Sequence, residues 1–422
     1  MTGAAGQGSG TAVMVQRFEG AFTQQEPIGE ESIAEAVAVM RSGRLHRYNS
    51  EPGEVSATSA LERAFADWQG AEYCLACASG GYATALALRA GGIGPDDAVL
   101  TNAFTLAPVP GAIAAVGARA VLVETTPDLV IDLDHLADRI DASGARLLLL
   151  SHMRGHVCDM DVLTSLLAER GVQLIEDCAH TMGASWDGRR SGGFGLAGCF
   201  STQTYKHMNS GEGGLLVSND AAFMARAILM SGSYMLYERH GAAPAPEVFE
   251  GLKLETPNMS GRMDNLRAAI LLPQLAVLDA NVVRWNRRYA VLAERLAATE
   301  GLHLPHRPAQ EHFVGSSIQF TLEAADDGEA ERFVAEAGAL GVELKWFGAK
   351  EPVGFTSSHE SWRYLAPQSL PRTDAVLARL FDMRIPLTFS LEDCAQIAEI
   401  IDYCAGRCRL NRRTICWGRY PS

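Results

Sequence analysis

Lys206 is the side chain in this sequence best placed to act as a nucleophile. The 422-residue chain contains four lysines, Lys206, Lys253, Lys345 and Lys350. Lys206 follows a short apolar run in the segment CFSTQTYKHMNSGEGG, residues 199–214, and precedes a glycine-rich turn. A lysine held in a partly desolvated cleft keeps a neutral amine that can condense with a carbonyl group. A lysine on a surface loop would have the same local sequence, so this segment alone leaves both interpretations open.

A second segment places an acid directly after an apolar run. LIEDCAHTMGA, residues 174–184, carries Glu176 and Asp177 at the end of an expected strand, with His180 three residues after Asp177. In open α/β sheets, ligands bind beyond the carboxyl ends of the strands. An acid there could serve a metal, a ribose or a protonated ring nitrogen, or it could be a solvated loop carboxylate.

A third segment could bind an anion. In ASGGYATALAL, residues 78–88, the tripeptide Ser79-Gly80-Gly81 precedes an Ala/Leu-rich helix. Small residues at a helix start let backbone N–H groups approach a phosphate, and the helix dipole favours the negative charge. An ordinary serine N-cap followed by flexible glycines is the other interpretation.

The three segments together match the needs of pyridoxal phosphate. Its phosphate needs N–H donors, its ring nitrogen needs an acid that keeps it protonated, and its aldehyde needs an amine. The helix start, Asp177 and Lys206 would supply these in turn. The sequence therefore predicts pyridoxal 5'-phosphate as the cofactor and no metal site.

These motifs resemble those of the DegT/StrS-type sugar aminotransferases, a branch of the fold-type-I pyridoxal-phosphate enzymes. The resemblance extends from about residue 28 to residue 405 and includes the segments HMRGHVCDMD, SGEGG and GRMDNLRAA. It implies that Lys206 is the Schiff-base lysine, that Asp177 pairs with the ring nitrogen, and that His180 contacts the oxygen side of the ring. It also implies phosphate contacts from Ser79, Gly80, Gly81 and Ser201.

Some positions differ from the family pattern. Gly81 stands where the family has threonine, so one hydroxyl toward the phosphate is missing. Leu106 replaces the aromatic residue that usually stacks on the cofactor ring, and Phe104 is a further candidate for that contact. The usual His-containing substrate stretch of the small domain is replaced by KWFGAKEPVGFTS.

The resemblance also implies a homodimer with active sites shared between subunits. In the family, an asparagine two residues before an arginine reaches the neighbouring subunit's phosphate. Here Ser260 precedes Arg262 by two residues and Asn258 lies two residues further back. Asn258, Ser260 and Arg262 are therefore cofactor-binding candidates, and either Asn258 or Ser260 is expected to be the residue that reaches the neighbouring subunit's phosphate.

The expected reaction is transfer of an amino group from glutamate or glutamine to a keto-sugar or keto-cyclitol, in aminosugar or antibiotic biosynthesis. The segment STQTYK, with Gln203 as a further cofactor-binding candidate, is most similar to the cyclitol aminotransferases. The same segment is also similar to the aminohydroxybenzoate synthases. A dehydratase or aromatase of that type, or a non-catalytic regulator that binds the cofactor, are the alternatives.

The elements around these motifs predict an α/β fold. Apolar runs without polar alternation recur between residues 70 and 220, separated by helical or loop stretches, which is typical of a mostly parallel sheet with helices on both faces. Helices are expected at residues 30–43, 58–68 and 263–300.

Two domains are expected from the length and from the change in pattern after residue 300. Residues 1–25 are expected to form a flexible leader, 26–290 the large cofactor-binding domain, 291–410 a smaller α+β domain and 411–422 a tail. Within the smaller domain, SIQFTL reads as a strand, and both DAVLARLFDMRIPL and SLEDCAQIAEIIDYCAG read as helix-rich.

Composition excludes several other classes of protein. The formal net charge is −14, which repels nucleic-acid backbones, and no apolar run approaches the ~20 residues needed to cross a bilayer. Nine cysteines, an odd number without zinc-finger spacing, indicate reduced thiols. A cytoplasmic protein that binds neither nucleic acid nor membrane is expected.

Overall fold

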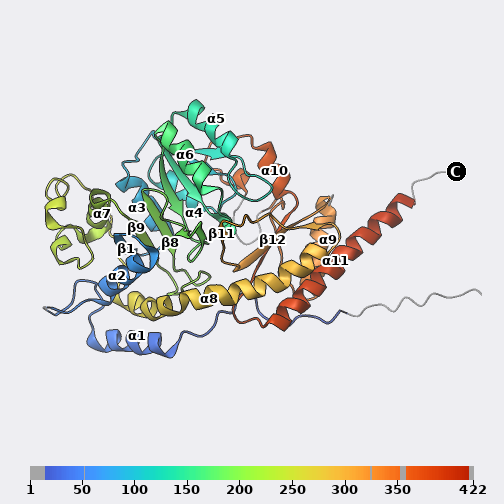
Figure 1. The fold of residues 1–422 in the computed structure, drawn as a ribbon, viewed down its shortest axis with the longest axis horizontal. Coiled ribbons are helices and arrows are strands. Elements are labelled where there is room, and N and C mark those ends of the chain that lie inside the picture. Colours follow the sequence, from blue (N-terminus) through green and yellow to red (C-terminus); the bar gives the residue numbers. More distant parts are fainter. Residues whose placement is uncertain (1–14, 52, 324–325, 352–357, 418–422) are drawn as a thin grey trace, which may run out of the picture.

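The computed structural model describes residues 15–51, 53–323, 326–351 and 358–417 (Figure 1). A seven-stranded sheet forms the centre of the larger part. Its strands lie in the order β1 (Tyr73–Cys77), β9 (Gly214–Ser218), β8 (Ala197–Ser201), β5 (Gln173–Asp177), β4 (Leu147–Ser151), β2 (Ala98–Asn102) and β3 (Arg119–Val123). From β8 to β3 all neighbours are parallel, whereas β9 is antiparallel to both β1 and β8. The expected mostly parallel sheet is confirmed.

Both faces of this sheet are covered by helices. Leu149 of β4 packs into one core with α3 and α4, while its neighbours Leu148 and Leu150 pack into another with α5 and α6. Every side chain of β4 is thus buried, which explains its unbroken leucine run. The helices of this part are α1 (Glu30–Ser42), α2 (Ala57–Gln69), α3 (Gly80–Ala90), α4 (Pro108–Ala115), α5 (Leu133–Ser143), α6 (Met160–Arg170) and α7 (Ala221–Ile228).

Helix α8 (Asn265–Ala298) connects the two parts of the chain. It begins at Asp264, whose side chain accepts a hydrogen bond from the Arg267 N–H at 2.9 Å. Its first half packs into the core beneath the large sheet through Leu271 and Leu278, and its second half packs into the smaller part through Leu296. By length and composition alone the helix could cross a membrane, and in the structure it packs against both cores along its length.

The smaller part contains an antiparallel sheet in the order β10 (Leu302–His303), β12 (Ser317–Leu322), β14 (Leu380–Arg384) and β13 (Lys345–Trp346). Helices α9 (Asp327–Ala339) and α11 (Leu391–Trp417) pack together beside it. A further small sheet joins β11 (Glu311–His312), β6 (Ser185–Trp186) and β7 (Arg189–Arg190). The expected boundary at residue 290 lies inside α8, so the division into two domains stays a prediction.

The helix-rich interpretation of DAVLARLFDMRIPL is wrong in its second half. Helix α10 (Pro371–Leu377) ends early, and the residues that follow form β14, a central strand of the smaller sheet. Phe381 pairs with Phe320 of β12, and their rings stack with centroids 5.8 Å apart. This cross-strand packing outweighs the weak helical periodicity of the segment.

The expectation of a flexible leader up to residue 25 also needs correction. Phe18 and Phe22 are buried in the core of the smaller part, where both contact the Phe389 ring edge-on. The Phe18 N–H also donates to the Leu340 carbonyl at 2.9 Å. Residues 15–25 are therefore packed, because two aromatic side chains fill that core, whereas residues 1–14 lie outside the described part. The expected tail begins within α11, which continues to Trp417.

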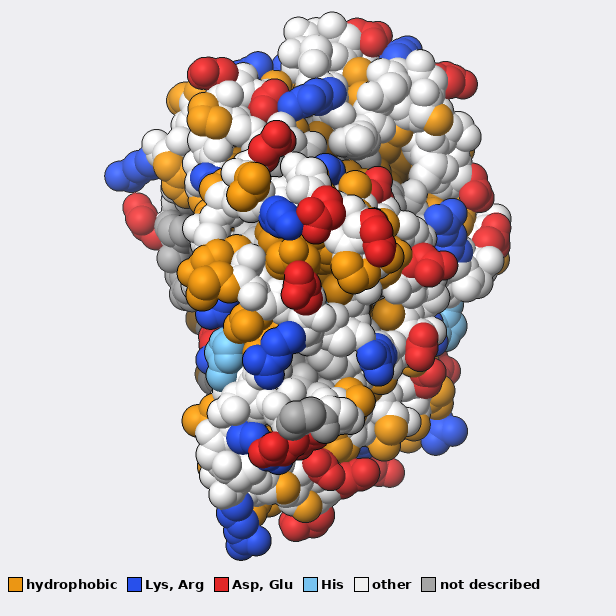
Figure 2. All heavy atoms as spheres, turned by 90° about the vertical axis from the view of Figure 1, so that its left-hand side faces the viewer, with side chains coloured by type: hydrophobic (Ala, Val, Ile, Leu, Met, Phe, Trp, Pro, Cys, Tyr) orange, Lys and Arg blue, Asp and Glu red, His pale blue; other side chains and the backbone are white. Residues whose placement is uncertain are grey.

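One end of the molecule exposes apolar side chains. Residues 229–256 follow α7 and form the left-hand end of Figure 1, which faces the viewer in Figure 2, where hydrophobic side chains gather near the centre. Tyr234, Met235 and Leu254 are 48%, 74% and 90% exposed. A contiguous apolar patch open to water is typical of surfaces that bind another protein.

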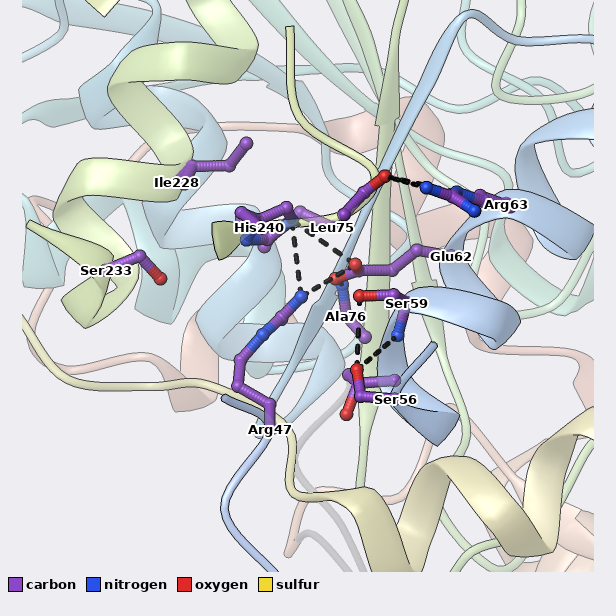
Figure 3. A network of polar contacts seen from close by, with 12 residues as sticks. Arg47, Ser56, Ser59, Glu62, Arg63, Leu75, Ala76, Ile228, Ser233 and His240 are labelled. Carbon is purple, nitrogen blue, oxygen red and sulfur yellow. Dashed lines mark hydrogen bonds and ion pairs between the residues drawn. The ribbon is translucent and has the colours of Figure 1, made fainter. Parts of the chain in front are cut away.

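A buried ionic network fastens this end to α2 (Figure 3). Arg47 and Glu62 form an ion pair at 2.7 Å with side chains 1% and 0% exposed, and His240 contacts both. Glu62 also accepts a hydrogen bond from the Ala76 N–H at 2.8 Å. Burial alone would raise the pKa of Glu62, but Arg47 and His240 bring that pKa down to about 2. The network thus ties the chain after α1, helix α2, strand β1 and the 229–256 segment together.

Replacing Glu62 should destabilise the fold strongly. Glu62→Gln leaves the Arg47 charge buried without its partner, so we expect a loss of ~3–5 kcal/mol in the free energy of unfolding, measured with urea at neutral pH. Asp141→Asn, at the exposed pair with Arg170, is the control and should stay within ~1 kcal/mol. Since the pKa of Glu62 is lowered, its contribution should be complete above pH ~4.3 and disappear as pH falls toward about 2. Equal effects of the two substitutions would contradict this role.

Candidate active site

A cavity lies where β4, β5 and β8 end and α3 begins. Because β4, β5 and β8 are parallel neighbours, their last residues Ser151, Asp177 and Ser201 reach the same edge of the sheet. The cavity is lined by residues from several of the expected motifs, among them Gly80, Gly81, Leu106, Asp177, His180, Ser201 and Lys206. The structure therefore brings the three sequence segments together at the position where α/β sheets bind ligands.

Asp177 is held in place by hydrogen bonds on both carboxylate oxygens. The Ser151 hydroxyl donates to Oδ2 at 2.9 Å, and the Ala179 N–H donates to Oδ1 at 3.2 Å. The Ser151 oxygen in turn accepts a hydrogen bond from the Thr105 hydroxyl at 2.8 Å. Asp177 thus presents its carboxyl group at a fixed position in the cavity.

Lys206 lies in the same cavity, and its backbone N–H donates to the Gln203 carbonyl at 2.8 Å. Removal from water lowers the pKa of its amine to about 7, against the opposing effect of Asp177, and Arg154 and Arg384 lower it further. About half of the amine is therefore neutral near pH 7. This is the condition that a nucleophilic lysine needs.

His180 occupies the side of the cavity nearest Arg154. Its Nδ1 accepts a hydrogen bond from the Arg154 N–H at 2.9 Å, so the neutral ring carries its proton on Nε2. Burial, with Lys206 and Arg154 nearby, holds the pKa of His180 well below its usual range. The ring is therefore a neutral N–H donor facing the cavity rather than a cation.

The start of α3 fits an anion. Gly80 and Gly81 line the cavity, and a Cβ on Gly80 would lie 2.8 Å from the Ser201 Cβ, so this position requires glycine. A Cβ on Gly81 would meet nothing within 4 Å. The Ser79 oxygen accepts a hydrogen bond from the Tyr82 N–H at 3.1 Å, which makes Ser79 the N-cap of α3. The open backbone N–H groups at this helix end suit a phosphate.

Two other candidates occupy different positions. Phe104 is fully buried and packs edge-on against Phe347 with ring centroids 5.2 Å apart, and it does not line the cavity. Leu106 does line it and also lines an adjoining outer cleft, together with Gln203. Within one chain, an aliphatic side chain from this loop therefore borders the cavity instead of an aromatic ring.

The three residues expected to act across a dimer lie outside the cavity of their own chain. Arg262 donates to the Gly232 carbonyl and forms a bridge with Cys77 at the end of β1. Asn258 and Ser260 are exposed on the same segment. They lie beside the 229–256 segment, since the Met259 and Gly261 N–H groups donate to the Met230 and Ser231 carbonyls, and their contact with a neighbouring subunit stays a prediction.

Glu176 has a structural role. Its carboxylate accepts hydrogen bonds from the N–H groups of Gly192, Phe194 and Gly195, and it contacts His152 Nε2 at 3.0 Å. These hydrogen bonds attach the loop between β7 and β8 to Glu176 on strand β5. His152, Glu176 and Cys178 lie close enough together to suggest a metal site, but this carboxylate is already fully used as an acceptor.

Sequence reasoning missed Ser151, Thr105 and Arg154. Ser151 is the first polar residue after the leucine run of β4, in the position on that strand that Asp177 holds on β5. A polar residue at the end of the strand next to Asp177 was the signal by which the sequence could have indicated Ser151. Arg154 lies in the quoted segment HMRGHVCDMD, but its contacts depend on the smaller part of the chain. Among the described cysteines all eight are free and buried, as expected of reduced thiols.

The residues present fit pyridoxal phosphate: a helix start with room for a phosphate, the Asp177 carboxyl group fixed by two hydrogen bonds and a lysine amine of lowered pKa. A mostly parallel sheet with these groups at one edge defines a pyridoxal-phosphate-dependent enzyme of fold type I. The chain belongs to the DegT/DnrJ/EryC1/StrS aminotransferase family, whose model matches residues 26–402.

Individual relatives are more distant. An L-glutamine:2-deoxy-scyllo-inosose aminotransferase of Streptomyces fradiae is 32% identical over 277 residues, or 65% of this chain, and the match spans 63% of that relative. An L-glutamine:scyllo-inosose aminotransferase of Streptomyces griseus is 30% identical, and the match covers 64% of this chain and 63% of that relative. The structure of a 3-amino-5-hydroxybenzoic acid synthase has a TM-score of 0.79 at 23% identity, covering 93% of this chain and all of that one. The structure of DesV from S. venezuelae has a TM-score of 0.75 at 26% identity, and the match covers 89% of this chain and 94% of that one.

The reaction of cofactor-free protein with pyridoxal phosphate should depend on pH. Only the neutral Lys206 amine attacks the aldehyde, so the rate, measured from the visible absorbance that develops, should rise with pH through a midpoint at about 7 and then level off. Asp177 raises the Lys206 pKa, so Asp177→Asn should shift this midpoint to lower pH. A midpoint near the usual lysine value of ~10.4 would contradict the geometry.

Proposed function

We propose that this protein is a pyridoxal-phosphate-dependent aminotransferase that moves an amino group from glutamine or glutamate to a keto-cyclitol or keto-sugar. One observation carries the chemistry: Lys206, Asp177 and the start of α3 line one cavity. Pyridoxal phosphate, when bound, supplies the electron sink that makes amino-group transfer possible. The family to which the chain belongs supports the reaction type.

The side chains of the cavity have distinct tasks in this proposal. Lys206 would hold the cofactor through its aldehyde, and its amine would act as the base and acid that move a proton at the donor carbon. Its lowered pKa lets the amine serve as base and then as acid near neutral pH. Asp177 holds a proton on the ring nitrogen, and Ser151 and Thr105 orient that carboxylate. His180 would offer its Nε2–H to the cofactor, because its Nδ1 already accepts from the Arg154 N–H.

The substrate class rests on the relatives. Two of them are named for glutamine as donor and an inosose as acceptor, and they match this chain at about one residue in three. The likeness to 3-amino-5-hydroxybenzoic acid synthase supports the fold alone, since it stands at 23% identity. We therefore favour a keto-cyclitol over a substrate that is aromatised, and a role in aminosugar or antibiotic biosynthesis in the cytoplasm.

We also propose a homodimer with shared active sites. The exposed apolar side chains Tyr234, Met235 and Leu254 lie on the segment that precedes Asn258 and Arg262. A second copy covering this surface would bury those side chains and bring Arg262 toward the neighbour's cavity. In this proposal Asn258, Ser260 and Arg262 do not line the cavity of their own chain because they contact the cavity of the neighbouring subunit.

Lys206→Ala should abolish covalent attachment of the cofactor. After borohydride reduction, mass spectrometry of the wild-type protein should show added cofactor on the Lys206 peptide, whereas Lys206→Ala should show none.

Wild-type protein with L-glutamine and scyllo-inosose should yield an aminated cyclitol, and Asp177→Ala should lower turnover by ~10² or more. Attachment to another lysine, or full turnover by Asp177→Ala, would overturn the assignment.

Mixed dimers should test the shared site. Lys206→Ala and Arg262→Ala should each be inactive alone. If Arg262 serves the neighbour's cavity, exchange of subunits creates one intact site per mixed dimer, about a quarter of wild-type sites at random pairing. Native mass spectrometry would document the exchange. No recovery of activity despite exchange would place Arg262 in its own chain's site or outside catalysis.

A further inference from the structure

The N-terminal segment, residues 15–26, forms part of the wall of the outer cleft. Its Phe22 and Gln25 line this cleft together with His180 and Lys206. The segment contains none of the cofactor motifs, and the proposed reaction gives it no task. It nevertheless borders the space beside the Lys206 amine, where a substrate has to lie. Its position therefore indicates a role in binding a substrate rather than the cofactor.

Aromatic packing and hydrogen bonding attach the beginning of this segment to the smaller part. The Phe18 and Phe22 rings contact the Phe389 ring edge-on, with centroids 5.1 and 4.9 Å away. Edge-on pairs of this kind add to the stabilisation that burial provides. The Gln396 amide of α11 also donates to the Gln16 carbonyl at 3.1 Å. The segment thus lies at a fixed place on the smaller part of the chain.

The backbone on both sides of Gln25 is fixed as well. The Gln24 carbonyl accepts a hydrogen bond from the Thr388 hydroxyl at 3.3 Å. The Glu26 carboxylate pairs with the Arg284 guanidinium of α8 through two contacts, at 2.5 and 2.9 Å. Paired contacts of this kind restrict the geometry more than a single ion pair does. The Gln25 side chain therefore reaches the cleft from a backbone that is held on either side.

Gln25 offers the cleft an amide that the chain does not use itself. Its side chain is half-buried and forms no hydrogen bond within the described part of the chain. Two serines that line the same cleft are already engaged. The Ser316 hydroxyl contacts His207 Nε2 at 3.0 Å, and the Ser317 hydroxyl accepts from the Gln319 amide at 2.8 Å. The Gln25 amide, with two N–H donors and an acceptor oxygen, is open to a ligand.

We infer that Gln25 binds a ring hydroxyl group of the acceptor and so determines which acceptors the enzyme uses. A hydroxyl group both donates and accepts hydrogen bonds, as an amide does, and neither group is charged. The carboxylate of an amino-acid donor instead prefers a cationic partner. A site that hydrogen-bonds a hydroxyl group discriminates against analogues that lack it. The acceptor's identity rests on the proposed function, but polyol binding can be tested without any reaction.

scyllo-Inositol provides that test, because it carries a hydroxyl group on every ring carbon and has no ketone. Calorimetric titration of the cofactor-loaded protein should show binding that weakens about tenfold in Gln25→Leu, which keeps the size of the side chain but not its hydrogen bond. Gln25→Ala gives the same comparison should the leucine variant not fold. Glu19→Gln, at an exposed position of the same segment, should bind like wild type. No binding by wild type, or equal binding by wild type and both Gln25 variants, would overturn the inference.

The two half-reactions separate acceptor from donor. Gln25→Leu should convert the cofactor with L-glutamine at wild-type concentrations, whereas conversion back should need about tenfold more scyllo-inosose. The opposite pattern, with L-glutamine impaired and scyllo-inosose unchanged, would assign Gln25 to the donor and overturn the inference. Wild-type protein that is inactive in both half-reactions would refute the proposed function, and the scyllo-inositol titration would then decide the inference by itself.

Discussion

The active site of this protein depends on keeping the Lys206 amine only partly protonated beside the Asp177 carboxyl group. Loss of water disfavours the ammonium form of Lys206, Asp177 favours it, and Arg154 and Arg384 oppose it again. The outcome is a pKa of about 7, well below that of an ordinary lysine. A small change in any of these groups would move the amine out of the range where it can both bind a proton and release it. The fold must therefore fix all of them at once.

Parallel strands provide that precision. The ends of β4 and β5 stand side by side, so Ser151 can donate directly to Asp177. Asn102, at the end of β2, fixes Ser151 through two hydrogen bonds. The Ser151 N–H donates to the Asn102 Oδ1 at 2.9 Å, and the Asn102 side-chain amide donates to the Ser151 carbonyl at 3.0 Å. Three neighbouring strands thus contribute one polar residue each to a rigid row. Backbone pairing, which depends little on side chains, sets the spacing of the groups that carry out chemistry.

The sequence predicted the parts of the site that are encoded by neighbours along the chain. Lys206, Asp177 and Gly80 stand in short segments whose composition indicates a role, and the structure places all three around one cavity. Ser151 and Arg384 could not be assigned in this way, because their importance comes from contacts between distant strands. For the same reason β14 was taken for a helix, since only its pairing with β12 shows it to be a central strand.

Helix α8 has a consequence for how the molecule loses its structure. It is 34 residues long, about 51 Å, and its two halves belong to different hydrophobic cores without a break between them. Melting either core would leave half of this helix unsupported, and an isolated stretch of that length is only marginally helical in water. We therefore expect these two cores to be coupled in unfolding, with α8 as the element that links them.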